Sequence, residues 1–238
     1  MSKNFEFNGF SKETIQFYRD LEQNNNKLWF EAHKNDFEHY VMDPAKDFVV
    51  TLGTSLQTIA PEVHADPRVN KSIFRIYRDT RFSKDKTPYK TNLALWFWVG
   101  NKAKFESPGY YFHLDAQKLM LGAGIHTFSK ELLKAYREAV IQPQLGASLP
   151  LALQNLSKKG DYNIGGKHYK RIPHGYNPDH ANAELLLYNG LTVGIESDIP
   201  EAFFSKELVD YCMERYKDMA PVVDWLSQMV QLAPETVL

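Results

Sequence analysis

The chain has 238 residues, of which 43% are apolar and 13% are aromatic. This is enough apolar material to bury a sizeable core, so we expect a folded globular protein. A single cysteine, Cys212, excludes an internal disulfide and a cysteine-based zinc cage. No run approaches the roughly 18 apolar residues that cross a bilayer, and residues 1–9 lack the apolar stretch of a secretory signal. We therefore expect a soluble, cytoplasmic protein with no membrane partner.

The formal net charge of −1 conceals a strong local imbalance. From Lys71 to Lys90 there are seven basic residues and two acidic ones, so this window has a charge of +5. The rest of the chain therefore has a charge of −6. This balance argues against a protein that coats nucleic acid in general, and it favours a localised anion site.

The first part of the chain, about residues 10–60, predicts three helices. Ser11 is a good N-cap for a helix that ends near Asn24, where the letters QNNN predict a turn. A second helix is expected over residues 27–41. The third begins at Asp43-Pro44 and has apolar residues at three- and four-residue spacing.

The centre, about residues 70–127, predicts antiparallel strands at residues 73–77, 93–99, 109–115 and 118–122, with DAQK as a tight hairpin turn. The rest, about residues 129–238, predicts a helix capped by Ser129, a second helix at 149–156 and a loop-rich segment at 158–180. A short helix at 184–187, a strand at 192–196 and C-terminal helices follow. The whole pattern predicts an α+β fold, a single domain over residues 1–238 with a mainly antiparallel sheet flanked by segregated helices.

Four motifs resemble one known family in their order and spacing. They are WF at Trp29-Phe30, FRIYRDTRFSKDKTPYKT from Phe74, the hairpin PGYYFHLD…LMLGAGIH, and YKRIPHGYNPDH from Tyr169. By these motifs the chain resembles the domain of unknown function family 2461, of bacterial and fungal proteins, from Phe10 to about Glu196. The resemblance implies a single full-length domain, and it implies no known activity, substrate or cofactor, so the cofactor is unknown. The chain departs from the family pattern at His174, where a lysine is usual, and at Asn182.

The central motif predicts an anion-binding site. In a regular strand the side chains alternate, so Arg75 and Arg78 point to opposite faces, and the loop after the strand must bring further cations to the same place. Arginine holds a phosphate or carboxylate through two parallel hydrogen bonds, whereas lysines contribute point charges. Asp79 is expected to orient an arginine. The predicted site in this segment consists of Arg75, Arg78, Asp79, Arg81, Lys84, Lys86, Tyr89 and Lys90.

The same residue types also suit a purely structural role. Arginine, aspartate and tyrosine in one loop can form ion pairs that fix a long connection to the sheet, with the lysines in solvent. The surplus of seven bases over two acids argues against this alternative, because an unpaired charge beside an apolar sheet is costly unless an anion offsets it.

A second basic segment, residues 158–180, is expected to complete the far wall of the same cleft. Lys170 and Arg171 supply charge, and Tyr176 can stack on a base or sugar. Gly165-Gly166 permits a close approach of the backbone. A solvated basic loop is the alternative.

Metal and nucleophile signals are weaker. His113 and Asp115 share one face of a predicted strand, and with His126 they make a conceivable metal or acid-base set. One HxD is common by chance, so no metal is predicted. Asp85 and His113 are the candidate proton carriers if the protein is an enzyme, which the sequence leaves uncertain. Gly122 and Gly124 lack the Walker lysine pattern and are expected at a bulge or strand exit.

These observations predict binding of a phosphate-bearing or polyanionic small molecule, such as a nucleotide, in a basic cleft. Two alternatives remain. Basic residues interleaved with aromatics can bind single-stranded nucleic acid. A protein-interaction or structural role is the other, with the apolar strand LALWFW as a contact surface if it lies at a sheet edge.

Overall fold

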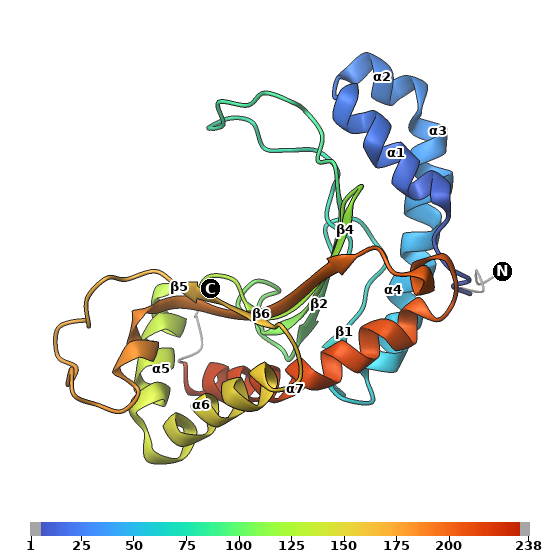
Figure 1. Cartoon of the computed structure of the whole chain (residues 1–238). Helices are drawn as coiled ribbons and strands as arrows, with labels where there is room; N and C mark the ends of the chain where they lie inside the picture. Colours follow the sequence, from blue (N-terminus) through green and yellow to red (C-terminus); the bar gives the residue numbers. More distant parts are fainter. Residues whose placement is uncertain (1–5, 234–238) are drawn as a thin grey trace. The chain divides into compact units, whose positions relative to one another are not determined.

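The structure is a computed structural model in which residues 6–233 are described (Figure 1). It combines helices with one six-stranded sheet and confirms the predicted α+β class with a mainly antiparallel sheet. The strand order is β1-β2-β3-β4-β6-β5. The strands are β1 (Val63–His64), β2 (Leu93–Val99), β3 (Gly109–Leu114), β4 (Lys118–Ile125), β5 (Asn163–Lys167) and β6 (Tyr188–Asp198).

The helices divide between the start, the middle and the end of the chain. They are α1 (Lys12–Gln23), α2 (Lys27–Ala32), α3 (Lys34–Asp36), the π-helix η1 (Phe37–Met42), α4 (Asp43–Leu56), α5 (Lys130–Ile141), α6 (Pro143–Ser157), the 3₁₀ helices η2 (Ala183–Leu187) and η3 (Glu201–Phe204), and α7 (Leu208–Leu232). The residues pack as two compact units, and each is described by itself. Unit 1 contains residues 6–97, 111–121 and 196–214, and unit 2 contains residues 98–110, 122–195 and 215–233.

In unit 1, short-range signals explain where the first helices begin. The Ser11 amide donates to the Thr14 hydroxyl at 3.3 Å, and the Asn26 side chain accepts from the Trp29 amide at 3.0 Å at the start of α2. The core lies between these helices and one face of the sheet, where the rings of Phe48 from α4 and Phe112 from β3 have centroids 5.1 Å apart.

The expected helix over residues 27–41 is wrong as a single helix. It ends at Ala32 and resumes as α3 and then as the π-helix η1. In η1 the Tyr40 carbonyl accepts a hydrogen bond from the buried Thr14 hydroxyl at 2.6 Å. A carbonyl group that a side chain from another helix satisfies does not need a regular helical partner, and a π-turn becomes stable there.

The expected strand at residues 73–77 is also wrong, because the chain changes its pairing partner in the middle of that segment. Phe74 donates its amide to Ala94 of β2 at 3.0 Å, whereas Ile76 accepts at 2.8 Å from the amide of Lys90. Only isolated bridges form, at Ile73 with Leu95 and at Tyr77 with Tyr89. Arg75 lies between these two pairings.

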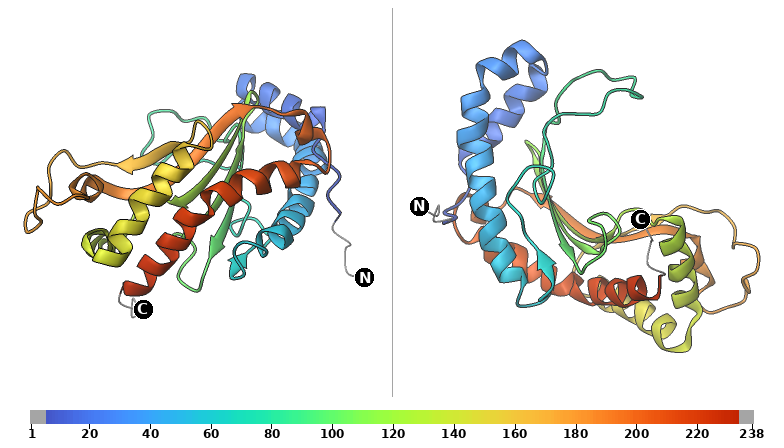
Figure 2. Two further views of the ribbon diagram at one scale, coloured as in Figure 1. Left: turned by 60° about the horizontal axis from the view of Figure 1, so that its bottom comes forward. Right: turned by 180° about the vertical axis from the view of Figure 1, so that it is seen from behind.

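In unit 2, Ser129 caps α5 by accepting from the Leu132 amide at 3.4 Å, as predicted. The strand β5 was expected as loop, because Asn163–Lys167 contains two glycines and little apolar character. It pairs antiparallel with β6, and a Cβ on Gly166 would lie 2.1 Å from the carbonyl oxygen of Gly190. The glycines therefore serve strand pairing. The expected C-terminal helices form the single long helix α7, which contains Pro221 and has residues 208–214 in unit 1 and 215–232 in unit 2 (Figure 2).

No helix within residues 6–233 is long and apolar enough to cross a bilayer.

Candidate anion-binding site

The basic loop leaves the sheet as a closed arm, which we define as residues 79–87. Its base is a short antiparallel ladder, in which Arg78 donates its amide to Pro88 at 2.9 Å and Lys90 donates to Ile76 at 2.8 Å. From this base the arm extends as the long teal loop beyond the end of β2 (Figure 1). The ladder therefore fixes the two ends of the arm to unit 1.

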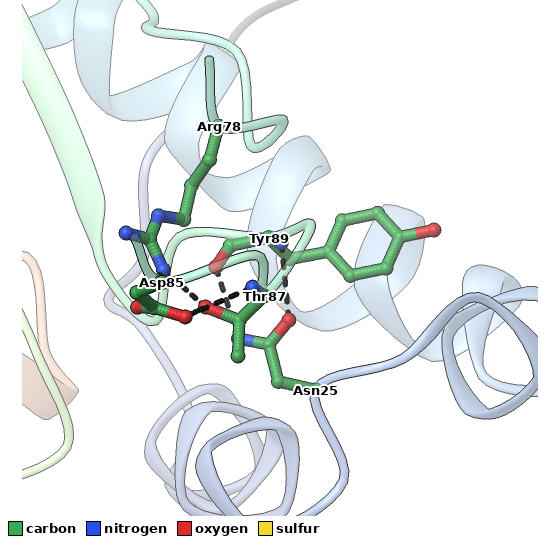
Figure 3. A network of polar contacts seen from close by, with 5 residues as sticks. All are labelled: Asn25, Arg78, Asp85, Thr87 and Tyr89. Atoms are coloured by element: carbon green, nitrogen blue, oxygen red, sulfur yellow. Dashed lines mark hydrogen bonds and ion pairs between the residues drawn. The ribbon is translucent and has the colours of Figure 1, made fainter. Parts of the chain in front are cut away.

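The side chain of Asn25, in the turn between α1 and α2, binds the backbone of Tyr89 at the base of the arm. The Asn25 carboxamide donates to the Tyr89 carbonyl at 2.9 Å and accepts from the Tyr89 amide at 3.0 Å (Figure 3). Tyr89 is 3% exposed, and its ring stacks on Phe30 with a centroid separation of 4.2 Å. Tyr89, a predicted anion ligand, is thus a core residue through its ring, and burial raises the pKa of its hydroxyl.

Inside the arm, the acidic residues bind arginines. Arg78 donates to the Asp85 carboxylate and to the Thr87 hydroxyl (Figure 3). Arg81 donates to both carboxylate oxygens of Asp79, at 2.9 and 2.7 Å. The hydrogen bonds from these arginines lower the pKa of Asp79 and of Asp85 to about 2. Asp79 does orient an arginine, as expected, and Asp85 does the same.

The arm accordingly shows the ion-pair network that was the structural alternative for this segment. A carboxyl group with a pKa of about 2 is a poor proton acceptor at neutral pH, so the contacts give no support to Asp85 as a proton carrier. Lys86 donates to the Thr80 carbonyl at 2.8 Å, and the Lys84 side chain is exposed. The anion-binding roles of Arg78, Arg81, Lys84 and Lys86 stay predictions.

A different arrangement lies where the arm joins the sheet. The ammonium of Lys90 lies 5.4 Å from the centroid of the Phe74 ring, and the Phe74 ring packs edge-on against Tyr111 at 6.3 Å. The Tyr111 hydroxyl lies 3.1 Å from Nδ1 of His113. We call Arg75, Lys90, Phe74, Tyr111 and His113 the Lys90 cluster. All five belong to unit 1.

Strand alternation explains why Tyr111 and His113 belong to this cluster. In β3, Tyr110, Phe112 and Leu114 are buried, while Tyr111 and His113 between them are half-buried on the opposite face. The amide nitrogen of Asn92 lies 3.4 Å from Nδ1 of His113. An amide nitrogen only donates, so Nδ1 accepts and the ring proton is on Nε2.

Arg75 and Lys90 differ from Arg78 and Arg81 in forming no ion pair with a carboxylate of the described residues, although the charge of Arg75 contributes to the lowered pKa of Asp79. Within residues 6–233 no carboxylate lies within ion-pair distance of Lys90 or Arg75. Burial and then the charge of Arg75 lower the pKa of Lys90. Burial also lowers the pKa of His113, against the opposing charges of Asp115 and Glu196, so this imidazole is neutral at pH 7.

The second basic segment belongs to unit 2. Lys170 and Arg171 are exposed and Tyr176 is half-buried. Lys167 and Lys159 pair with the carboxylates of Glu184 and Asp218. The shared cleft with the first segment stays a prediction, because the two segments belong to different units.

The metal alternative finds no support in the described part of the chain. No group of three His, Cys, Asp or Glu side chains within residues 6–233 is placed to hold a metal ion.

Gly124 has φ of +127°, and a Cβ there would lie 2.1 Å from the Leu191 carbonyl oxygen. It therefore serves close pairing of β4 with β6.

A hollow of about 600 Å³ lies elsewhere in unit 1. Lys12, Ile15 and Arg19 of α1 line it together with Ala116 and Phe204. None of the predicted site residues lines it, so the sequence motifs do not point to this hollow.

The sequence missed three residues that the structure places around the site. Asn25 and Asn92 act through side-chain amides, and Tyr111 acts through its hydroxyl. The alternation in PGYYFHLD was the signal for Tyr111, because it put Tyr111 and His113 on one face. The contact of Asn25 with a residue 64 positions away had no local signal.

A search of curated proteins gave no match to the chain. The model of one protein family, described as "Conserved hypothetical protein (DUF2461)", matches residues 13–225. That range contains the arm, the Lys90 cluster and the second basic segment. Because the match covers most of the sequence, the chain belongs to this family.

Proposed function

We propose that the protein binds a small molecule that carries a phosphate or a similar anionic group, and that the anion binds at the Lys90 cluster. The observation that supports this proposal is that Arg75 and Lys90 form no ion pair with a carboxylate among residues 6–233, although Arg75 also acts on Asp79 through its charge. The half-buried Lys90 ammonium loses hydration, and it is repelled by the charge of the exposed Arg75. A bound anion offsets both costs.

The neighbouring side chains suit a ligand with an anionic end and a flat or apolar body. The guanidinium of Arg75 can donate two parallel hydrogen bonds to a phosphate, and the Lys90 ammonium adds a point charge. Phe74 and Tyr111 provide aromatic surface beside Lys90. The neutral His113 offers its Nε2 proton as a hydrogen-bond donor. A nucleotide or a sugar phosphate has this combination of groups.

Calorimetric titration with inorganic phosphate, a nucleoside monophosphate, a nucleoside diphosphate and a sugar phosphate tests the proposal. The variants are Arg75→Gln and Lys90→Met, and the control is Lys206→Gln, which removes an exposed cation of unit 1. We expect one of the compounds to bind the wild type and the control equally, and both cluster variants at least about tenfold more weakly, because each loses a charged hydrogen bond. Binding that Arg75→Gln and Lys90→Met leave unchanged would refute this location.

Single-stranded nucleic acid is the second candidate, and a feature of the arm favours it. Phe82 is 95% exposed, and the Arg81 guanidinium lies 5.8 Å from its ring. An exposed ring between cations is a platform for stacking a base. We expect polymer binding to weaken steeply as salt rises and to depend on Phe82, whereas the small-molecule site should be less sensitive to salt and independent of Phe82.

The third candidate, a protein-interaction surface on the strand LALWFW, finds less support because this strand is not a free sheet edge. β2 lies between β1 and β3 in the sheet, and residues 72–74 pair with its Ala94–Trp96 segment. Strand addition at that edge would have to displace these hydrogen bonds.

A further inference from the structure

The hollow of about 600 Å³ beside α1 shares no residue with the Lys90 cluster or with the arm. One part of its lining is a face of α1 that carries Lys12, Gln16 and Arg19. The rest comes from the turn between β3 and β4 and from the segment that follows β6, namely Ala116, Gln117, Ile199 and Phe204. All of these residues belong to unit 1. A hollow of this volume is large enough for a small organic molecule.

The two cations of the lining lie on the same side of α1. A helix turns by about 100° per residue, so Lys12, Gln16 and Arg19 lie within about 60° of one another around its axis. Glu13, the acid of the lining, lies about 100° round from Lys12 by the same geometry. Neither Lys12 nor Arg19 forms an ion pair with a carboxylate among residues 6–233, although the charge of Lys12 contributes to the lowered pKa of Glu13.

Apolar side chains make up much of the remaining lining. Ile15 and Ala116 are 6% and 1% exposed, whereas Ile199 and Phe204 are only half-buried. A ligand that covers Ile199 and Phe204 removes apolar surface from water, which favours its binding. The hollow thus offers apolar surface next to two cations.

We propose that this hollow binds a carboxylic acid with an apolar body, such as a bicyclic aromatic acid. Arg19 holds the carboxylate through two parallel hydrogen bonds, Lys12 adds a second positive charge, and the apolar body covers Ile199 and Phe204. The charges of Lys12 and Arg19 with that of Glu13 give the lining a charge of +1, which complements a carboxylate better than a doubly charged phosphate. The site is separate from the proposed anion site at Arg75 and Lys90.

Calorimetric titration of the full chain with 2-naphthoate tests the proposal, and 2-naphthylmethanol is the matched compound without a charge. We expect the acid to bind the wild type at least about tenfold more tightly than the alcohol, because only the acid forms charged hydrogen bonds with Arg19. Equal affinities would overturn the choice of an acid. No binding of either compound at millimolar concentration would overturn the site itself.

Three variants locate the ligand. Arg19→Gln should weaken binding of the acid about tenfold and change binding of the alcohol little. Gln16→Trp places a bulky side chain at an exposed position of the lining, so it should abolish binding of both compounds. Lys34→Gln removes an exposed cation of unit 1 outside the lining and should leave both affinities unchanged.

Binding of 2-naphthoate that Arg19→Gln and Gln16→Trp both leave unchanged would refute the hollow as its site. Far-UV circular dichroism of each variant checks that it is folded. The exposed positions of Gln16 and Arg19 make a loss of the fold an unsuitable explanation for weaker binding when the spectra agree.

Discussion

The side chain of Asn25 bonds both backbone groups of Tyr89, at 2.9 and 3.0 Å, across 64 residues of sequence. A carboxamide has one donor and one acceptor in the geometry of a peptide group, so Asn25 replaces a neighbouring strand at this position. The contact joins the turn between α1 and α2 to the residue that precedes Lys90.

Replacing Asn25 by alanine should destabilise the protein. The Tyr89 amide and carbonyl would lose their partners in a largely buried place, at a cost of about 1–3 kcal/mol. Urea denaturation measures this loss. Asn25→Asp keeps the acceptor and loses the donor, so we expect an intermediate loss, and Asn101→Ala, in an exposed turn, should change stability little. Equal stability of Asn25→Ala and wild type would show that the contact contributes nothing.

The Arg78–Asp85 pair should give the arm a pH-dependent stability. The pKa of Asp85 is about 2 in the folded chain, below the value of about 3.9 for an unfolded chain. A lowered carboxyl pKa stabilises the fold above the unfolded value, and this contribution is lost as the pH falls from about 4 to about 2.

Asp85→Asn should therefore lower the denaturation midpoint at pH 7 and differ less from wild type at pH 2 to 3. Since Asp85 is exposed, the effect should also shrink in high salt. A difference between the two proteins that is constant from pH 7 to pH 2 would contradict this account.

The charge of Lys90 should destabilise the fold at neutral pH, whereas the charge of Asp85 stabilises it. Its pKa is lowered in the folded chain, so the charged form destabilises the fold at neutral pH, and this cost disappears as the pH rises towards the unfolded value of about 10.4. We expect Lys90→Met to raise the melting temperature at pH 7 and the gain to shrink by pH 10. A melting temperature that falls at pH 7 would indicate that Lys90 is a structural residue.

Gly124 should not tolerate a side chain. A Cβ at this position would lie 2.1 Å from the Leu191 carbonyl oxygen, and φ is +127°. Gly124→Ala should cost about 2–5 kcal/mol, from backbone strain and from overpacking against β6. Gly175 is the matched control, because its φ is +90° and nothing lies within 4 Å of a Cβ there.

Gly175→Ala should therefore cost only the strain, about 1–2 kcal/mol. Thermal unfolding of both variants measures the difference. Similar losses in the two proteins would mean that the close approach of β4 and β6 is not what Gly124 provides.

Local signals predicted most of the fold. Caps and apolar spacing located α1, α4 and α5, and alternation located β2 and the β3–β4 hairpin, whose Asp115 carboxylate accepts the amides of Gln117 and Lys118 at 2.7 Å. The errors occurred where distant residues decide. The Thr14 contact stabilises η1, and pairing with β6 turns a glycine-rich segment into β5.

In the candidate site, too, contacts between near neighbours could be predicted and contacts between distant residues could not. Asp79 and Arg81 are two residues apart, so their ion pair could be expected from the sequence. The surroundings of Lys90 could not be expected from the sequence, because they combine Phe74 with Tyr111 and His113 of β3, a distant segment. Counting charges selected residues 71–90 and did not show which cations in that segment have acidic partners.

The ladder at the base of the arm has a consequence for variation of the chain. Because Arg78 bonds to Pro88 and Lys90 bonds to Ile76 before the arm begins, residues 79–87 close on themselves. Insertions or deletions within the arm should therefore be tolerated without moving Arg75 or Lys90. The sequence of residues 79–87 can therefore vary independently of the proposed anion site at Arg75 and Lys90.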